Sequence, residues 1–193
     1  MFPERIERDA IVLERLARPH VDAFELYELF GEDIERARGV FEYVPQEPYA
    51  TVKDAHDLLT AAETEWDDRE RAWYAVHEAD GTLAGVAILD LEWDRRLASL
   101  AGLLGRPYWG NGYAGTCAHV LLELAFDRLE LAVVTMGYDE GNERSEALIE
   151  RLVDEFGGQY DGARRNATER DGELVDAYDY SVTREQYRAA TGA

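Results

Sequence analysis

Lysine and cysteine are almost missing from this sequence. Among 193 residues there is one lysine, Lys53, and one cysteine, Cys117. A single cysteine excludes an intramolecular disulfide and a multi-cysteine zinc site. Because Cys117 lies in an apolar stretch of a predicted helix, we interpret it as a small buried hydrophobic residue and not as a nucleophile.

Long apolar runs and metal-binding patterns are also missing. No run of about 18 apolar residues predicts a membrane-spanning helix, so we expect no membrane partner. The first residues, MFPERIERD, carry charges where a secretory signal needs an apolar segment, and we expect a cytoplasmic protein. The four histidines are scattered without H-E-x-x-H spacing, and we expect no metal site.

Positive charge is scarce, because 41 acidic residues face 20 basic ones and the net charge is −21. Such a surface repels phosphates, so we expect no nucleic-acid partner. The charge could attract a cationic substrate. The acidic residues are spread along the whole chain, however, and we favour the interpretation of a general acidic surface adaptation such as halophiles have.

The length and an apolar fraction of 46% predict a single domain over residues 1–193. The patterning predicts a mixed, mostly antiparallel α/β (α+β) sheet flanked by helices. Turn signals are Asp80-Gly81 and Asp171-Gly172. The expected strands cover 10–15, 72–77, 83–89, 97–104, 131–138, 159–164 and 174–182, and the expected helices cover 19–31, 53–66, 112–129 and 145–156.

The stretch GRPYWGNGYAG, residues 105–115, joins an expected strand to an expected helix. Glycines there let a phosphate approach the free amides of a helix N-terminus. The spacing matches the dinucleotide fingerprint G-x-G-x-x-G, but that fingerprint belongs to the first turn of a parallel βαβ sheet. A coenzyme A turn and a plain tight turn remain alternatives. A P-loop is excluded, because no Lys-Ser/Thr pair follows the glycines.

Residues 85–162 resemble the GCN5-related N-acetyltransferases (GNAT), most closely the RimJ/RimL-type branch. The branch often has Pro-Tyr-Trp-Gly-x-Gly-Tyr-Ala, which this chain carries over 107–114. Downstream, Asn142-Glu143-Arg144-Ser145 matches the Asn-x-x-Ser of the family. The resemblance implies acetyl-CoA as co-substrate and strands 97–104 and 131–138 that splay apart around it. It also implies that the residues binding acetyl-CoA are Leu103, Leu104, Trp109, Gly110, Asn111, Gly112, Tyr113, Ala114, Asn142 and Ser145.

The resemblance further implies direct transfer of an acetyl group to a primary amine. Glu92 is the first candidate for the base and Asp90 its rival. The family often has a Tyr seven positions after the Asn, but this chain has Ile149 there, so Ser145 becomes the candidate acid, ahead of Tyr138. Asn142 and Ser145 could equally form a plain helix cap.

The resemblance implies that the acceptor is a protein N-terminus or a small amine. Its pocket is expected among residues 20–50 and 160–180, where the aromatic candidates are Phe30, Phe41, Tyr43, Tyr49 and Tyr160. The alternative function is a non-catalytic acyl-CoA-binding or regulatory module on the same fold. The oligomeric state stays open, with a homodimer as one alternative.

Overall fold

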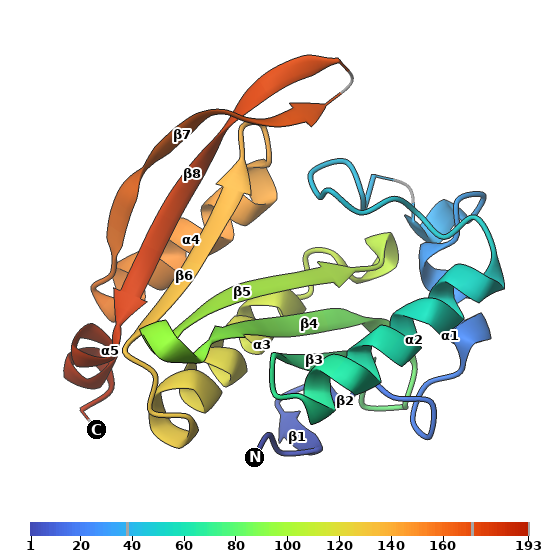
Figure 1. Cartoon of the computed structure of the whole chain (residues 1–193), viewed down its shortest axis with the longest axis horizontal. Coiled ribbons are helices and arrows are strands. Elements are labelled where there is room, and N and C mark those ends of the chain that lie inside the picture. The colour runs from blue at the N-terminus through green and yellow to red at the C-terminus, as the bar shows by residue number, and fades with distance from the viewer. Residues whose placement is uncertain (38, 171, 193) are drawn as a thin grey trace. The chain divides into compact units, whose positions relative to one another are not determined.

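The computed structural model describes residues 1–37, 39–170 and 172–192. Within these residues eight strands pair in the order β1-β2-β3-β4-β5-β6-β8-β7 (Figure 1). β5 and β6 run parallel, whereas the pairs β1–β2, β2–β3, β3–β4, β6–β8 and β7–β8 run antiparallel. The predicted mixed, mostly antiparallel sheet with flanking helices is therefore confirmed.

The chain divides into two compact units, which we describe separately. Unit 1 comprises residues 1–91 and 101–121, and unit 2 comprises residues 92–100 and 122–193. The boundary passes through strand β5, Leu97–Leu104, so each unit holds half of that strand.

Unit 1 is built on an antiparallel meander covered by two helices that pack on each other. In the second helix the buried residues Ala55, Leu59, Ala62 and Trp66 recur every three or four positions. This spacing gives one apolar stripe, which packs against β3. The elements are β1 (Arg5–Arg8), β2 (Ile11–Arg15), α1 (Ala23–Phe30), α2 (Val52–Asp67), β3 (Arg71–Glu78), β4 (Leu83–Glu92, whose last residue belongs to unit 2) and most of α3 (Tyr113–Glu123).

The β3–β4 connection is the hairpin that Asp80-Gly81 predicts. Gly81 has φ 90°, and the Asp80 carboxylate accepts a hydrogen bond from the Thr82 amide at 2.9 Å. A glycine is required again at Gly85 in β4, because a Cβ there would lie 2.2 Å from the Leu103 carbonyl oxygen. The close approach lets the second half of β5 lie against β4.

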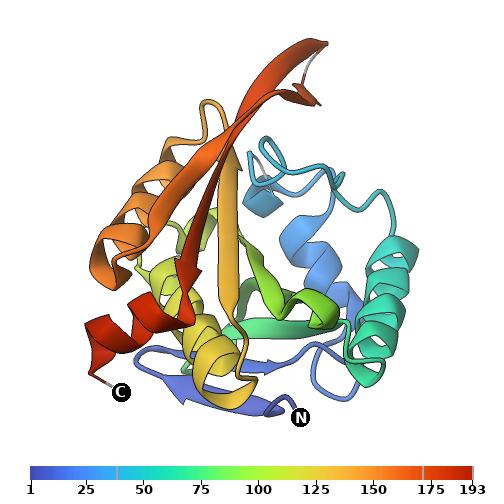
Figure 2. The same cartoon turned by 60° about the vertical axis from the view of Figure 1, so that its left-hand side comes forward.

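Unit 2 is built on a long hairpin beside a central strand (Figures 1 and 2). Its elements are β6 (Val133–Asp139), α4 (Glu143–Phe156), β7 (Gln159–Arg170), β8 (Glu173–Thr183) and α5 (Arg184–Thr191), preceded by the π-helical turn Leu124–Arg128. β5 joins β6 through the pairs Leu97↔Val133 to Ser99↔Thr135. The splaying of these strands beyond Ser99 stays a prediction.

The core of unit 2 forms where α4 and α5 bring aromatic rings together. α4 buries Ile149, Leu152 and Phe156 on one stripe. The Tyr187 ring of α5 lies 5.5 Å from Phe156 and 4.9 Å from Phe126, measured between ring centroids. Gly157, with φ 65°, then ends α4 in the left-handed conformation that glycine adopts without strain.

Several elements differ from the sequence prediction, such as β7, which extends to Arg170 and not only to residue 164. The first helix begins at Ala23 and not at Pro19, because Asp22 and Glu25 form a capping box. Strand β1 and helix α5 were not predicted, since each is short and rich in charge. The predicted Asp171-Gly172 turn falls partly on Asp171, which lies outside the described residues, whereas Gly172 has φ 81°.

Candidate functional site

The glycine-rich turn between β5 and α3 lies wholly in unit 1 and is held at both ends by side chains. After β5, Arg106–Tyr108 forms one 3-10 turn. The Trp109 indole N–H donates to the Leu104 carbonyl at 2.8 Å. The Tyr113 hydroxyl donates to Glu78 Oε1 at 2.6 Å. These two bonds fix the backbone of the turn against the ends of β5 and β3.

The open side of this turn is where its glycines lie. Gly110 and Gly112 have φ of 82° and 83°, and a Cβ at either would meet no atom within 4 Å. Thr116 is the first residue whose amide bonds back into the helix, to Gly112 O at 3.1 Å. Among the described residues, the backbone amides from Gly110 to Gly115 donate to no backbone carbonyl. The turn therefore offers free amides at the positive end of a helix, which suits a phosphate.

The predicted contact strand, Leu103 and Leu104, lies directly before the turn. The Leu104 carbonyl already accepts the Trp109 indole, and the next amide, Gly105 N–H, donates to Ala84 O at 2.9 Å. Trp109 thus anchors the turn by its hydrogen bond to the Leu104 carbonyl. The sequence pattern does not specify this role.

Asn142 and Ser145 lie together at the start of α4 in unit 2. The Asn142 side-chain oxygen accepts the Ser145 amide at 3.2 Å, so Asn142 is the N-cap of the helix. The capping interpretation is confirmed. Capping uses the backbone of Ser145 and leaves its hydroxyl for another partner.

The two candidate bases end β4 and are both paired with arginine. Glu92 lies 2.9 Å from Arg95 in unit 2. Asp90 lies 2.9 Å from Arg71 in unit 1. All four side chains are 40% to 66% exposed, so these ion pairs are weak and either carboxylate can exchange its partner.

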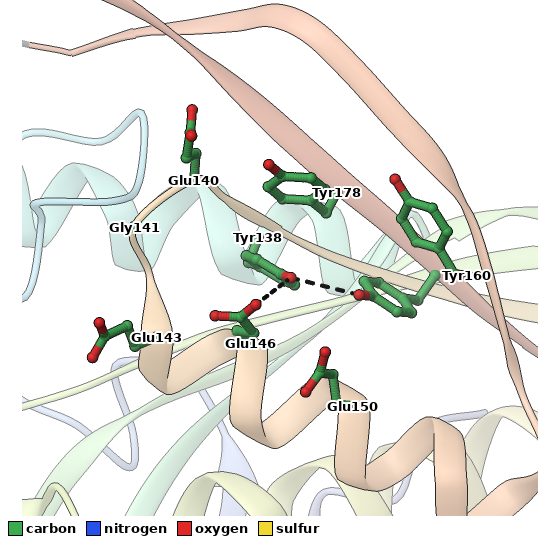
Figure 3. A pocket seen from close by; sticks show the side chains of 9 residues that line it. Tyr138, Glu140, Gly141, Glu143, Glu146, Glu150, Tyr160 and Tyr178 are labelled. Atoms are coloured by element: carbon green, nitrogen blue, oxygen red, sulfur yellow. Dashed lines mark hydrogen bonds between the residues drawn. The ribbon is translucent and has the colours of Figure 1, made fainter.

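A cavity of about 530 Å³ opens in unit 2 between α4 and the strands β6, β7 and β8 (Figure 3). The Tyr138 hydroxyl donates to Glu146 Oε1 at 3.0 Å. Burial raises the pKa of Tyr138, helped by its hydrogen bonds to Tyr180 and Glu146, so it is a poor proton donor at neutral pH. The cavity is lined by Tyr138, Glu140, Gly141, Glu143, Glu146, Glu150, Tyr160, Tyr178 and Tyr180.

The sequence prediction did not identify most of the residues that line this cavity. It named only Tyr160, as a candidate for the acceptor pocket, and Tyr138, as a candidate acid ranked after Ser145. The sequence carries only part of the signal: Tyr178 and Tyr180 are two apart on one strand and must share a face, but their meeting with Tyr138 and Tyr160 depends on strand register. Phe30, by contrast, is buried and packs edge-on against Phe41 and Tyr49. Phe30 therefore belongs to the core of unit 1, whereas Phe41 and Tyr49 are half-buried beside it.

Cys117 is buried in α3, and burial raises the pKa of its thiol to about 12. A protonated, enclosed thiol is not a nucleophile at neutral pH.

The sequence of this chain matches a known protein family. The family model described as "Acetyltransferase (GNAT) domain" matches residues 11–152, which include the glycine turn and the start of α4. The chain belongs to the GNAT acetyltransferases. The match covers most of the chain, and acetyl transfer is the chemistry that these proteins share.

Individual GNAT relatives are similar over most of their length. The uncharacterized N-acetyltransferase p20 of Bacillus licheniformis is 23% identical over 150 residues, which are 77% of this chain and 82% of that protein. A GCN5-related N-acetyltransferase from Brucella melitensis has a TM-score of 0.77 at 20% identity, covering 98% of this chain and 85% of its own. A ribosomal-protein-alanine acetyltransferase from Vibrio fischeri has a TM-score of 0.79 at 15% identity, covering 95% and 98%. At these identities the two structures show the fold alone.

The described residues contain no group of three His, Cys, Asp or Glu side chains that could hold a metal ion. No helix among them is both long and apolar enough to span a membrane.

Proposed function

We propose that the chain is an N-acetyltransferase that transfers acetyl from acetyl-CoA directly to a primary amine. In this proposal the whole chain, 1–193, acts as one domain of the RimJ/RimL type. The single observation that carries the proposal is the glycine turn, where the amides from Gly110 to Gly115 are free of backbone acceptors.

The chemical features of the turn fit the pyrophosphate of acetyl-CoA. Positive-φ glycines keep side chains off the amides, and the axis of α3 directs its positive end toward the turn. Asn111 occupies a position where a basic residue would add charge, so binding relies on amides. Leu103 and Leu104 are proposed to pair with the pantetheine, with Trp109, Tyr113 and Ala114 completing the turn.

The proposed chemistry needs a base and an acid from this chain. Acetyl-CoA supplies an activated thioester. Glu92 accepts a proton from the alkylammonium acceptor, because such an amine is protonated at neutral pH and cannot attack in that form. The freed amine forms the amide bond as the carbon–sulfur bond breaks. As the nitrogen loses its second proton, Ser145 accepts that proton and passes its own hydroxyl proton to the leaving thiolate. Asn142 helps to place the coenzyme.

Calorimetric titration in high salt, with acetyl-CoA and separately with NAD, tests the coenzyme. We expect saturable binding of acetyl-CoA and none of NAD. NAD binding alone would favour the dinucleotide interpretation of the glycines. If the folded protein binds neither, the turn is structural only.

A glycine variant locates the binding. Val at Gly112 would be strained, because φ is 83° and β-branched residues avoid that region. Asn tolerates it, and Gly112→Asn places a side chain in the open space over the turn. We expect at least about a tenfold loss of acetyl-CoA affinity. Gly81→Asn is the matched control, because Gly81 also has a positive φ and no atom within 4 Å of a Cβ.

The base is tested by comparing Glu92→Gln with Asp90→Asn. Both remove an arginine-paired carboxylate from the end of β4. We expect kcat/KM to fall by about a hundredfold in Glu92→Gln and to change little in Asp90→Asn. The reverse order would make Asp90 the base.

Turnover distinguishes the proposed enzyme from the alternative of a non-catalytic acyl-CoA-binding module. A chain that binds acetyl-CoA but releases no free coenzyme A with any amine of a broad panel would be a binding module. The panel should include small amines and peptides with free N-termini, because both belong to the proposed acceptor class. The oligomeric state, including a homodimer, is read from light scattering of the same samples.

A further inference from the structure

The cavity of unit 2 presents only aromatic rings, carboxylates and one glycine. Among the described residues, none of its lining side chains is basic. Figure 3 shows the Tyr138 hydroxyl beside the Glu146 carboxylate, with Tyr160 and Tyr178 on the strands above α4. At about 530 Å³ the cavity is large enough for a small organic molecule.

The aromatic half of the cavity is a cluster of four tyrosines. The Tyr138 ring stacks on Tyr180 with centroids 6.0 Å apart, and it lies 5.2 Å from Tyr178. Tyr160 lies 5.1 Å from Tyr180. Ring faces carry partial negative charge, so this cluster attracts a cation.

Two of these tyrosines are polar groups held nine-tenths out of solvent. Tyr138 and Tyr180 are each 9% exposed. Their hydroxyl oxygens are 3.5 Å apart, whereas hydroxyl hydrogen bonds are usually near 2.8 Å. The Tyr138 hydroxyl has a second hydrogen bond, to Glu146. The Tyr180 hydroxyl has only the 3.5 Å hydrogen bond to Tyr138 among the described residues. A buried hydroxyl this weakly bonded gains from a ligand in the cavity.

The carboxylate half follows one side of α4. Glu143, Glu146 and Glu150 are three and four residues apart, and Glu140 precedes the helix. A rise of 1.5 Å per residue separates Glu143 from Glu150 by about 10 Å along the axis, and Glu146 from Glu150 by about 6 Å. No ion pair engages these carboxylates among the described residues. Their charges are spread in a row and do not converge on one point.

We propose that this cavity binds a linear diammonium cation. Each ammonium group bonds a carboxylate of the α4 row, and the methylene chain between them packs on the tyrosine rings. A row of charges suits two separated ammonium groups better than one compact ion. Anions are repelled, and a neutral ligand would leave the carboxylates unused. The site lies entirely in unit 2, so the proposal does not depend on the coenzyme turn.

The test is calorimetric titration with 1,4-diaminobutane, butylamine and 1,4-butanediol at moderate salt. These probes share a four-carbon chain and differ in having two, one or no ammonium groups. We expect one saturable site for the diamine, binding at least about fivefold weaker for butylamine, and none for the diol. Equal binding of the diamine and butylamine, or no saturable binding of the diamine, would overturn the proposal.

Two variant pairs separate the cavity from the acidic surface as a whole. Glu150→Gln and Asp154→Asn each remove an exposed carboxylate of α4, but only Glu150 lines the cavity. We expect diamine affinity to fall about fivefold in the first and to stay unchanged in the second. Tyr178→Leu removes a ring and should weaken binding, whereas Tyr178→Phe keeps the ring and should retain it. Equal losses in Glu150→Gln and Asp154→Asn would show non-specific attraction to the acidic surface. Equal losses in the two Tyr178 variants would show that the ring does not hold the ligand. Either result would overturn the proposal.

Discussion

At the scale of single residues, burial sets the chemistry of two side chains that sequence patterns leave ambiguous. His77 in β3 is half-buried, and its Nε2 atom has no hydrogen-bond partner among the described residues. Burial lowers the pKa of His77, against the smaller opposing effects of Glu14 and Glu25. The folded protein therefore resists protonation of this ring more than the unfolded chain does.

This histidine predicts a pH dependence of stability. Above the ordinary histidine pKa of 6.5 the ring is neutral in both states and costs nothing. As the pH falls below that value the unfolded chain takes up the proton first, so the free energy of unfolding decreases until the lowered folded pKa is passed. His77→Leu removes the contribution of this ring to the pH dependence of the free energy of unfolding. Urea denaturation at about pH 8 and at about pH 5.5 should show a smaller difference for the variant, and equal differences would contradict the assignment.

Cys117 gives a second prediction at this scale. Because its thiol is enclosed and its pKa is raised to about 12, almost none of it is thiolate at neutral pH. Iodoacetamide should modify the folded protein far more slowly than the urea-unfolded protein, followed by mass spectrometry. Comparable rates in the two states would show that α3 exposes the thiol.

At the scale of elements, the start of α4 separates a structural role from a coenzyme role. Asn142→Ala removes the cap and should lower the free energy of unfolding by about 1 kcal/mol, measured by denaturation. Asn142→Ser keeps a capping oxygen and should restore most of that stability. If Asn142 also contacts acetyl-CoA, the Ser variant will be stable and yet bind the coenzyme weakly. Full affinity in that variant would leave Asn142 as a cap only.

Elements were more predictable than the site. Periodicity gave α2 and the β3–β4 hairpin closely, since apolar spacing and an Asp-Gly turn are local signals. Pro19 was misleading, because the helix start depends on the reciprocal bonds of Asp22 and Glu25. The glycine turn could be predicted from its spacing. The tyrosine and glutamate cavity could not, because its rings come from β6, β7 and β8, and their meeting depends on strand register.

At the scale of the whole molecule, the charge of −21 predicts a response to salt. Unpaired carboxylates repel one another, and the arginine–carboxylate pairs of the described residues are mostly exposed and weak. From about 0.1 M to about 1 M KCl the Debye length falls from about 10 Å to about 3 Å, which screens the repulsion. We expect the thermal midpoint to rise over this range in calorimetry. A falling midpoint would mean that ion pairs outweigh repulsion.

The chain passes between the two units three times, at 91/92, 100/101 and 121/122. No single cut of the polypeptide can therefore release both units whole, and neither unit corresponds to one uninterrupted stretch of gene. Exchanging either unit whole with that of a related protein therefore requires crossovers at all three of these boundaries. The glycine turn lies before the crossing at 121/122 and the cap of α4 lies after it, so a single crossover at that point would combine the turn of one parent with the cap of the other.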